Sequence, residues 1–149
     1  MNIEIIFSQN QATLCHIAEH LRQCDTEFMP PLSSRLNIDD YAYKIWKRAM
    51  KFEAITNGKL VGLLAMYCND KLNQLAFITN VSVLPEYQHQ GIGLKLLNQS
   101  LAYAKKSAFL NVDLEVNNND VRAIDLYSRI GFFHHSLNED TSQMRCSLV

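Results

Sequence analysis

The fold of this sequence is decided by residues 81–93, which read Val-Ser-Val-Leu-Pro-Glu-Tyr-Gln-His-Gln-Gly-Ile-Gly. An alternating apolar strand leads into a short loop at Pro85, and Gly91 and Gly93 then open a helix. A helix N-terminus has about four unpaired N–H groups and a partial positive charge, so it can hold a phosphate group. Glycine lets a bulky pyrophosphate approach the backbone. The segment therefore predicts an anion site between a strand and a helix.

Two familiar nucleotide motifs do not fit this segment. The dinucleotide-binding fingerprint needs a third glycine where this sequence has Leu96, and the Gly-Lys-Ser/Thr of a P-loop does not occur. Taken alone, a Gly-x-Gly pair is also compatible with a tight strand–helix turn that binds nothing. At this point the sequence is also compatible with an unrelated α/β nucleotide-binding protein.

The rest of the sequence reads outward from this segment as a regular order of elements. Hydrophobic periodicity and turn residues predict strands at residues 3–7, 52–56, 59–68, 75–83, 111–116, 132–135 and 143–148. They predict helices at residues 14–21, 38–49, 91–109 and 121–130, with Asn37 as the N-cap of the second. A hairpin-rich half precedes a β-α-β-α half. This order predicts an α/β fold with a mixed sheet and helices on both faces.

Length and composition set the broad class of the protein. A chain of 149 residues can bury a sizeable core, and we expect residues 1–149 to form a single domain. The 14 Lys and Arg nearly balance the 15 Asp and Glu, so no overall field attracts nucleic acid or a membrane. No signal peptide or membrane helix is recognisable, and we expect a cytoplasmic protein. The four cysteines lack zinc spacing, so we expect reduced thiols and no metal.

Two separate motifs resemble the GNAT superfamily of N-acetyltransferases. Gln88-x-x-Gly91-x-Gly93 and the strand before it resemble the coenzyme A pyrophosphate loop of that family. The second motif lies downstream and reads Leu114-Glu115-Val116, then Ala123-Ile124-x-Leu126-Tyr127-x-x-x-Gly131-Phe132. The motifs stand in the order found in that family, and the predicted elements outside them also fit its fold.

The resemblance implies an acetyl-CoA-dependent N-acetyltransferase, in which an amine attacks the thioester directly without a covalent enzyme intermediate. It implies that acetyl-CoA binds where two parallel strands, ending at Val83 and Val116, splay apart. The backbone N–H of Val83 would polarise the thioester carbonyl. Tyr127 would be the general acid, since a phenol of pKa ~10 can protonate a thiolate whose acid has a pKa of ~8.5. The alternative is that Tyr127 is a core residue of its helix.

The resemblance also assigns the residues that bind coenzyme A. They are Val81, Ser82, Val83, Gln88, His89, Gln90, Gly91, Ile92, Gly93, Asn118, Asn119 and Tyr127. Asp120 stands where many relatives carry asparagine. A carboxylate there can cap a helix but cannot donate a hydrogen bond, so Asn118 or Asn119 is expected to take over that contact.

The sequence leaves the general base open. Many relatives carry a glutamate on the central strand, and residues 77–80 here contain no carboxylate. Glu53, Asp70, His134 and His135 are the alternatives, together with ordered water. The missing carboxylate also leaves open a non-catalytic member of the fold that only binds acyl-CoA.

The acceptor is expected to bind between the first two helices. Phe28, Arg35 and Tyr41 combine aromatic rings with a cation there and can bind a sugar ring or a carboxylate. A hydrophobic lid packed on the sheet is the alternative for the same residues. We expect a small-molecule amine such as an amino sugar, with a protein N-terminus or a lysine second. Residues 143–148 are expected to form an edge strand that can pair with a second chain in a homodimer.

Overall fold

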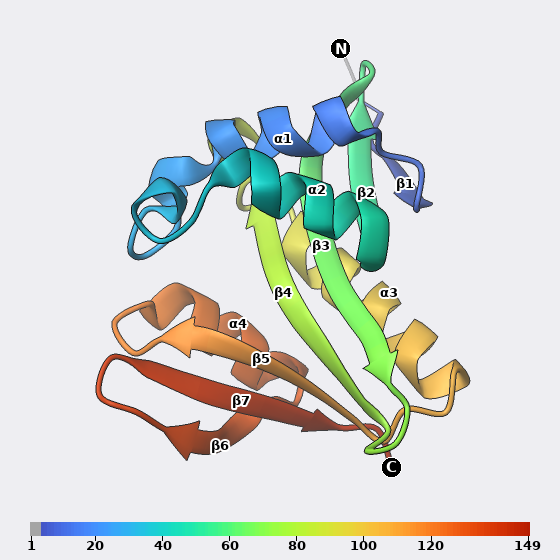
Figure 1. Cartoon of the computed structure of the whole chain (residues 1–149), viewed down its shortest axis with the longest axis vertical. Coiled ribbons are helices and arrows are strands. Elements are labelled where there is room, and N and C mark those ends of the chain that lie inside the picture. Colours follow the sequence, from blue (N-terminus) through green and yellow to red (C-terminus); the bar gives the residue numbers. More distant parts are fainter. Residues whose placement is uncertain (1–3) are drawn as a thin grey trace.

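The computed structural model describes residues 4–149, which form one mixed sheet covered by helices on both faces (Figure 1). The strands are β1 (Ile6–Gln9), β2 (Met50–Thr56), β3 (Lys59–Asp70), β4 (Leu75–Val83), β5 (Asn111–Asn117), β6 (Phe133–Leu137) and β7 (Thr141–Ser147). The helices are α1 (Leu14–Gln23), α2 (Ile38–Arg48), α3 (Ile92–Lys106) and α4 (Val121–Ile130). The predicted fold class is confirmed.

Local sequence signals fixed most element boundaries. The Asn37 side chain caps α2 by accepting a hydrogen bond of 2.9 Å from the N–H of Asp40. Asp120 caps α4 in the same way, through the N–H of Ala123. The strand expected at residues 3–7 begins at Ile6 in the structure, and its first predicted residue lies outside the described residues.

The alternation of β3 divides the core between the two faces of the sheet. Leu63 and Ala65 pack with α1 and α2, whereas Leu64 and Met66 pack with α3. A Cβ added at Gly62 would lie 2.7 Å from Ile92 on α3, so glycine permits this close approach of helix and strand. This contact fixes the start of α3 against the centre of the sheet.

The parallel strands β4 and β5 pair over only part of their length. The paired residues run from Leu75–Asn111 to Ile78–Leu114, and beyond Ile78 the two strands separate (Figure 1). The remainder of β4 stays on β3, and the remainder of β5 stays on β7. The splayed pair of strands expected from the sequence is therefore present.

A β-bulge at Thr79 interrupts the pairing of β4 with β3. Ala65 pairs with Asn80 and Met66 pairs with Ile78, which leaves Thr79 without a partner. The extra residue reverses the alternation of β4. Before the bulge, Ile78 packs into the core on the α3 face; beyond it, Asn80 pairs with a residue of the α1 and α2 face.

The predicted edge strand is wrong. The strand order is β1-β2-β3-β4-β5-β7-β6, so β7 lies between β5 and β6 and both of its edges are paired. The hairpin over residues 133–147 places its first strand, β6, on the outside. Residues 143–148 therefore have no free strand edge through which a homodimer could pair.

Candidate active site

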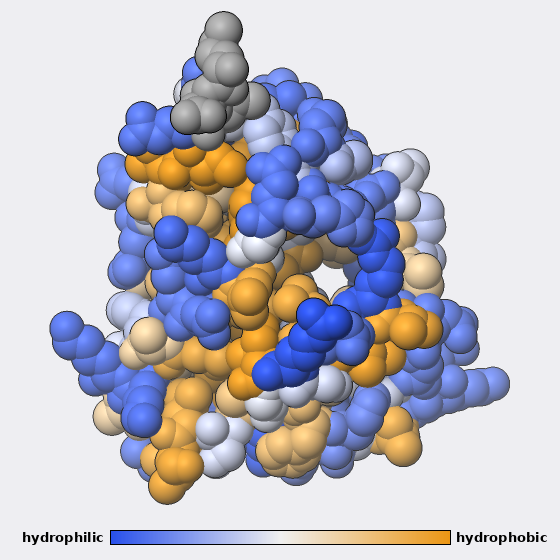
Figure 2. Space-filling view, turned by 180° about the vertical axis from the view of Figure 1, so that it is seen from behind, coloured by the Kyte–Doolittle hydropathy of each residue, from blue (hydrophilic) through white to orange (hydrophobic). Residues whose placement is uncertain are grey.

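A cleft of about 1100 Å³ fills the gap where β4 and β5 separate. Its walls come from those strands, the start of α3, one side of α4 and the segment between α1 and α2. Figure 2 shows the molecule from behind, with an opening that passes through it in this region. A cleft that is open on two faces can receive two ligands from opposite sides.

One end of the cleft is formed by the open start of α3. Gly91 has a φ of 78° and is followed by the helix without any side-chain cap. A Cβ added at Gly91 would meet nothing within 4 Å, so the helix start faces open space. Gly91, Ile92 and Gly93 all line the cleft, and the N–H groups of this first turn precede the first intrahelical bond, from Lys95 to Gly91. The arrangement suits an anion.

The side chain of Gln88 joins three parts of the cleft wall. Its Nε2 donates to Glu27 Oε1 at 2.8 Å and to the carbonyl oxygen of Val83 at 3.1 Å. Gln88 therefore contributes its backbone to the loop before α3 while its side chain connects β4 to the α1–α2 segment. Gln90, two residues further on, does not line the cleft.

An arginine and a histidine flank the same loop. Arg122 Nη2 lies 2.8 Å from His89 Nε2, and both residues line the cleft and are exposed. Sequence reasoning singled out His89 and missed Arg122. The sequence carried a signal for Arg122, because the residue lies in the first turn of α4. A cation there interacts unfavourably with the helix dipole, which suggests that Arg122 has another role.

The edge of β4 presents free peptide groups to the cleft. The N–H of Leu84 donates to the carbonyl oxygen of Val61 on β3 at 2.8 Å. Peptide groups along a strand point alternately to its two sides, so those of Val81 and Val83 point away from β3 and into the gap. The carbonyl of Val83 is taken by Gln88, which leaves its N–H for a ligand.

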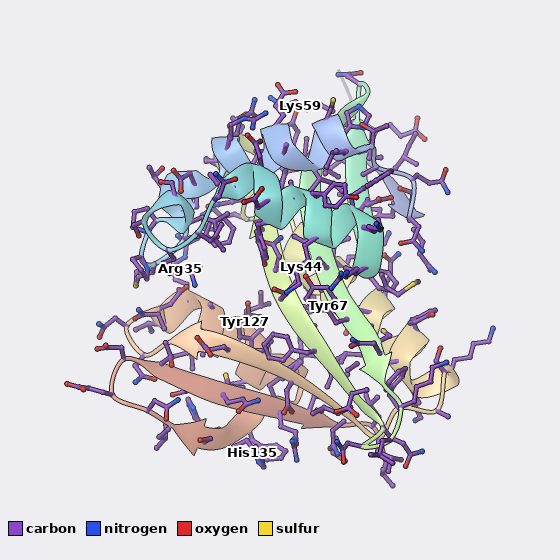
Figure 3. All side chains as sticks on the ribbon, viewed as in Figure 1. Arg35, Lys44, Lys59, Tyr67, Tyr127 and His135 are labelled. Atoms are coloured by element: carbon purple, nitrogen blue, oxygen red, sulfur yellow. The ribbon has the colours of Figure 1, made fainter. Side chains whose placement is uncertain are left out.

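Tyr127 extends from α4 into the gap between β4 and β5 (Figure 3). Its ring lies 5.9 Å from that of Phe132 between centroids, which holds one side against the core. Burial, and then the nearby Asp120 carboxylate, raise the pKa of Tyr127 above its usual range. The phenol is therefore protonated at neutral pH. Among residues 4–149, no group is hydrogen-bonded to its hydroxyl.

Asn118 and Asn119 do not reach the cleft. The Asn118 amide donates to the carbonyl oxygens of Asn138 and Glu139 at 3.2 and 3.3 Å, and its Oδ1 accepts from Ser142. These bonds commit the side chain to the turn between β6 and β7. The residues of this loop that do line the cleft are Asn117 and Asp120, so a role for Asn118 in holding the cofactor does not fit.

Glu115 on β5 is a cleft carboxylate that sequence reasoning missed. Its neighbours Leu114 and Val116 pack into the core on the α3 face, so alternation turns Glu115 to the opposite face, where it is exposed. Asp113 on that face is bound by Arg145 at 2.7 and 2.9 Å. Within the described chain Glu115 has neither an ion pair nor a side-chain hydrogen bond. The residue was already visible in the second motif, as the polar position of an apolar strand.

The residues first considered as bases lie elsewhere. Glu53 is fully buried and accepts hydrogen bonds from Ser8 and from the N–H groups that precede α1. Asp70 binds Asn73 in the β3–β4 turn. His134 and His135 are exposed on β6, and Figure 3 shows His135 far from the gap. None of the four lines the cleft, so the structure does not bring these alternatives to it.

The other end of the cleft contains the predicted acceptor residues. Phe28, Arg35 and Tyr41 all line it, and Figure 3 shows Arg35 on the segment that borders the opening. Tyr41 donates a hydrogen bond to the carbonyl oxygen of Thr79, the bulged residue. Within residues 4–149 no cluster of three or more His, Cys, Asp or Glu is placed to bind a metal, and all four cysteines are free thiols.

Comparison with known proteins places this arrangement in a family. Residues 16–132 match the model of the acetyltransferase (GNAT) family. The chain belongs to the GNAT family. An N-acetyltransferase of Methanocaldococcus jannaschii, itself uncharacterized, is 38% identical to this GNAT chain over 85 residues, which are 54% of this chain and 38% of that protein. The [ribosomal protein bS18]-alanine N-acetyltransferase of Escherichia coli K12 is 31% identical over 86 residues, 58% of this chain and 56% of the relative. The chain thus covers less than two thirds of the length of these curated relatives.

Solved GNAT structures share the whole fold. PaiA N-acetyltransferase from Thermoplasma acidophilum, solved with coenzyme A, superposes with a TM-score of 0.74 at 18% identity and covers 99% of both chains. The ribosomal-protein-S18-alanine N-acetyltransferase of E. coli gives a TM-score of 0.78 at 23% identity over 97% of this chain and 94% of that chain. At these identities the likeness establishes the fold alone. No helix within residues 4–149 has the length and apolarity to cross a membrane.

Proposed function

We propose that this GNAT chain acts as one domain that transfers an acetyl group from acetyl-CoA to a primary amine. The observation that carries the proposal is the cleft at the β4–β5 gap. An open helix start, free strand peptide groups, a protonated phenol and a carboxylate without a partner all border it. The crystal structure of the PaiA relative with coenzyme A supports the choice of cofactor.

The residues at one end of the cleft fit coenzyme A. The N–H groups of the first turn of α3 would hold the pyrophosphate, and the cation of Arg122 lies beside them. The peptide groups of Val81 and Val83 would pair with the pantetheine arm as an added strand does. The N–H of Val83 would polarise the thioester carbonyl. Acetyl-CoA supplies the activated acetyl group as its thioester.

Two side chains can move the protons of the transfer. Glu115 is the base, because the other carboxylates that line the cleft are engaged: Glu27 by Gln88, Asp120 by its own helix, and Asp125 by Arg129 at 2.9 Å. Tyr127 holds a proton on Oη at neutral pH and can donate it to a leaving thiolate. Its raised pKa makes full transfer uphill, so we assign it a hydrogen bond that strengthens as negative charge develops.

Two classes of acceptor fit the second opening of the cleft. A small amine would bind between Arg35, Tyr41 and Phe28. The E. coli relative is named for an alanine of ribosomal protein bS18, which favours a protein N-terminus as the second candidate. A panel of alkylamines, amino sugars and alanyl peptides, read by mass spectrometry of the acetylated product, separates the two classes.

The variant Glu115→Gln tests the chemistry of the site. We expect it to lower kcat by about 10²- to 10⁴-fold on the best acceptor, with no change in the Kd of acetyl-CoA. The matched control Glu139→Gln removes an exposed carboxylate of the β6–β7 turn and should leave both quantities unchanged. Tight binding of acetyl-CoA without transfer to any amine would contradict the proposal and favour an acyl-CoA-binding protein.

A further inference from the structure

Buried polar side chains connect α1 to the cleft through β4. His20 is 2% exposed, and its Nδ1 lies 2.9 Å from the carbonyl oxygen of Leu60. Its Nε2 lies 2.8 Å from Ser82 Oγ. The amide Nδ2 of Asn80 lies 2.9 Å from the same Oγ and 3.2 Å from the carbonyl oxygen of Leu63. Three side chains and two backbone carbonyls are thus linked in one buried network.

The chemistry of the partners fixes the direction of every bond in this network. A carbonyl only accepts, so His20 carries its proton on Nδ1 and donates it to Leu60. Burial lowers the pKa of His20 to about 4, so the ring is neutral at pH 7 and its Nε2 accepts from the Ser82 hydroxyl. The oxygen of Ser82 then accepts from Asn80. A flipped Asn80 amide would place Oδ1 against the carbonyl oxygen of Leu63. Both atoms are acceptors and cannot bond each other, so the flipped orientation is excluded.

This network leaves one atom without a partner. Asn80 Oδ1 is buried and accepts no hydrogen bond from residues 4–149. Asn80 as a whole residue is 4% exposed, and it lines the cleft. Buried acceptors are nearly always paired, so an unpaired acceptor with a fixed orientation, on a residue that lines the cleft, points to a donor supplied by a ligand.

The position of Asn80 indicates which ligand supplies the donor. It follows the bulge at Thr79, which turns it to the α1 and α2 face, where Tyr41 and Arg35 line the acceptor end of the cleft. Glu115 faces the same side of the sheet. The peptide groups assigned to the pantetheine arm instead lie in the plane of the sheet.

We propose that Asn80 Oδ1 binds an N–H of the acceptor amine, and that Ser82 and His20 are positioning residues that hold the amide in this orientation. The inference rests on the proposed function. A neutral primary amine has two N–H groups and one lone pair. The lone pair forms the N–C bond while the C–S bond breaks and its electrons pass to sulfur. One nitrogen proton passes to Glu115, and the other N–H stays bonded to nitrogen and donates to Asn80 Oδ1, while Tyr127 Oη donates to the departing thiolate.

A secondary amine cannot satisfy both groups, because its neutral form has a single N–H. The site should therefore prefer a primary amine over its N-methyl derivative. A variant that is merely less stable should keep this preference for the primary amine. A variant that loses the preference therefore identifies the group that produces it.

The experiment compares Asn80→Ala with the wild-type protein, using alaninamide and glucosamine and the N-methyl derivative of each as probes. We expect the variant to raise the KM of the primary amine about tenfold or more and to abolish the preference over the N-methyl compound. The Kd of acetyl-CoA should not change. Ser82→Ala should shift the same two readouts in the same direction, Ser82→Thr should restore them, and the exposed Asn98→Ala should change neither.

The possible failures are distinguishable. A folded Asn80→Ala protein with unchanged amine KM and unchanged preference would overturn this inference alone and assign Oδ1 to a buried water. A weaker Kd for acetyl-CoA in the variant would overturn it in favour of a contact with the cofactor. If the wild-type protein acetylates neither these probes nor any other amine of the panel, the proposed function fails and this inference with it. Should Asn80→Ala not fold, the Ser82 pair decides.

Discussion

The hydroxyl of Tyr41 lies 2.7 Å from the carbonyl oxygen of Thr79 and 2.8 Å from its Oγ1. The phenol has one proton and gives it to the carbonyl, so the threonine hydroxyl donates back to the phenol oxygen. Through Tyr41, helix α2 on the acceptor side of the cleft thereby holds Thr79, the bulged residue of β4. The bulge in turn decides which side chains of β4 face the acceptor.

Replacing Tyr41 by phenylalanine should loosen the bulge. We expect Tyr41→Phe to lower the free energy of unfolding by about 1–3 kcal/mol, because a half-buried carbonyl loses its donor. The KM of the acceptor should rise as well. Urea unfolding and steady-state kinetics measure the two effects. Tyr43→Phe is the control, since Tyr43 is 47% exposed and packs on Trp46 outside the cleft. Equal stability of both variants would contradict the account.

Arg122 should contribute to cofactor binding through its charge. We expect Arg122→Gln to weaken the binding of coenzyme A by about 10- to 100-fold, the usual value of a hydrogen bond between charged groups. The loss should shrink as salt is added, because both partners are exposed. Calorimetric titration at two salt concentrations measures it. Arg22→Gln, which breaks an exposed ion pair between Arg22 on α1 and Asp39 on α2, should leave the affinity unchanged.

The sequence predicted the framework of the site better than its side chains. Residues 81–93 and the second motif located the strands, the open helix start and Tyr127, because these depend on local patterns of glycine and apolar residues. Asn80 and Ser82 face α1 only because of the bulge at Thr79, and a bulge depends on pairing with β3. His20 meets Ser82 across 62 residues of sequence, a contact that no local pattern encodes.

The carboxylate that lines the cleft and the order of the outer strands both depend on tertiary structure rather than on a local pattern. The sequence candidates for a base came from β2, β3 and β6, whereas the cleft is bordered by β4 and β5. Glu115 comes from the second of them. The order of β6 and β7 was reversed because a hairpin pattern shows which strands pair but not which one joins the sheet.

Tyr127 should act on the rate rather than on cofactor binding. We expect Tyr127→Phe to lower kcat by about 10²- to 10⁴-fold with little change in the Kd of acetyl-CoA. Since burial raises the pKa of Tyr127, the phenol stays protonated beyond its usual range, and the wild-type rate should not fall between pH 7 and about 9.5 for this reason. Tyr103→Phe on α3 is the control. An alkaline decline near pH 8 that only the wild-type protein shows would contradict the role.

His20 should make stability depend on pH. In the unfolded chain a histidine binds a proton below about pH 6.5, whereas folded His20 stays neutral down to about pH 4. The unfolded state therefore binds more protons in this window, so stability is complete above pH 6.5 and falls as the pH is lowered toward 4. The group accounts for about 3 kcal/mol of that loss.

Urea unfolding of His20→Asn at pH 7, 5.5 and 4.5 isolates this contribution. The variant should lose less stability than the wild-type protein over the same range, while His134→Asn, exposed on β6, should behave as the wild type does. Parallel pH dependences of the wild type and His20→Asn would show that the buried ring is not the source.

Thermal unfolding with coenzyme A, acetyl-CoA, ATP or NAD tests the central claim, that the β4–β5 cleft binds coenzyme A through the open start of α3. A ligand at about 100 times its Kd adds about 2.7 kcal/mol, which for a chain of this size raises Tm by roughly 5–10 °C. The account predicts such a rise with coenzyme A and acetyl-CoA, and none with ATP or NAD. An unchanged Tm with coenzyme A, or an equal rise with ATP, would contradict it.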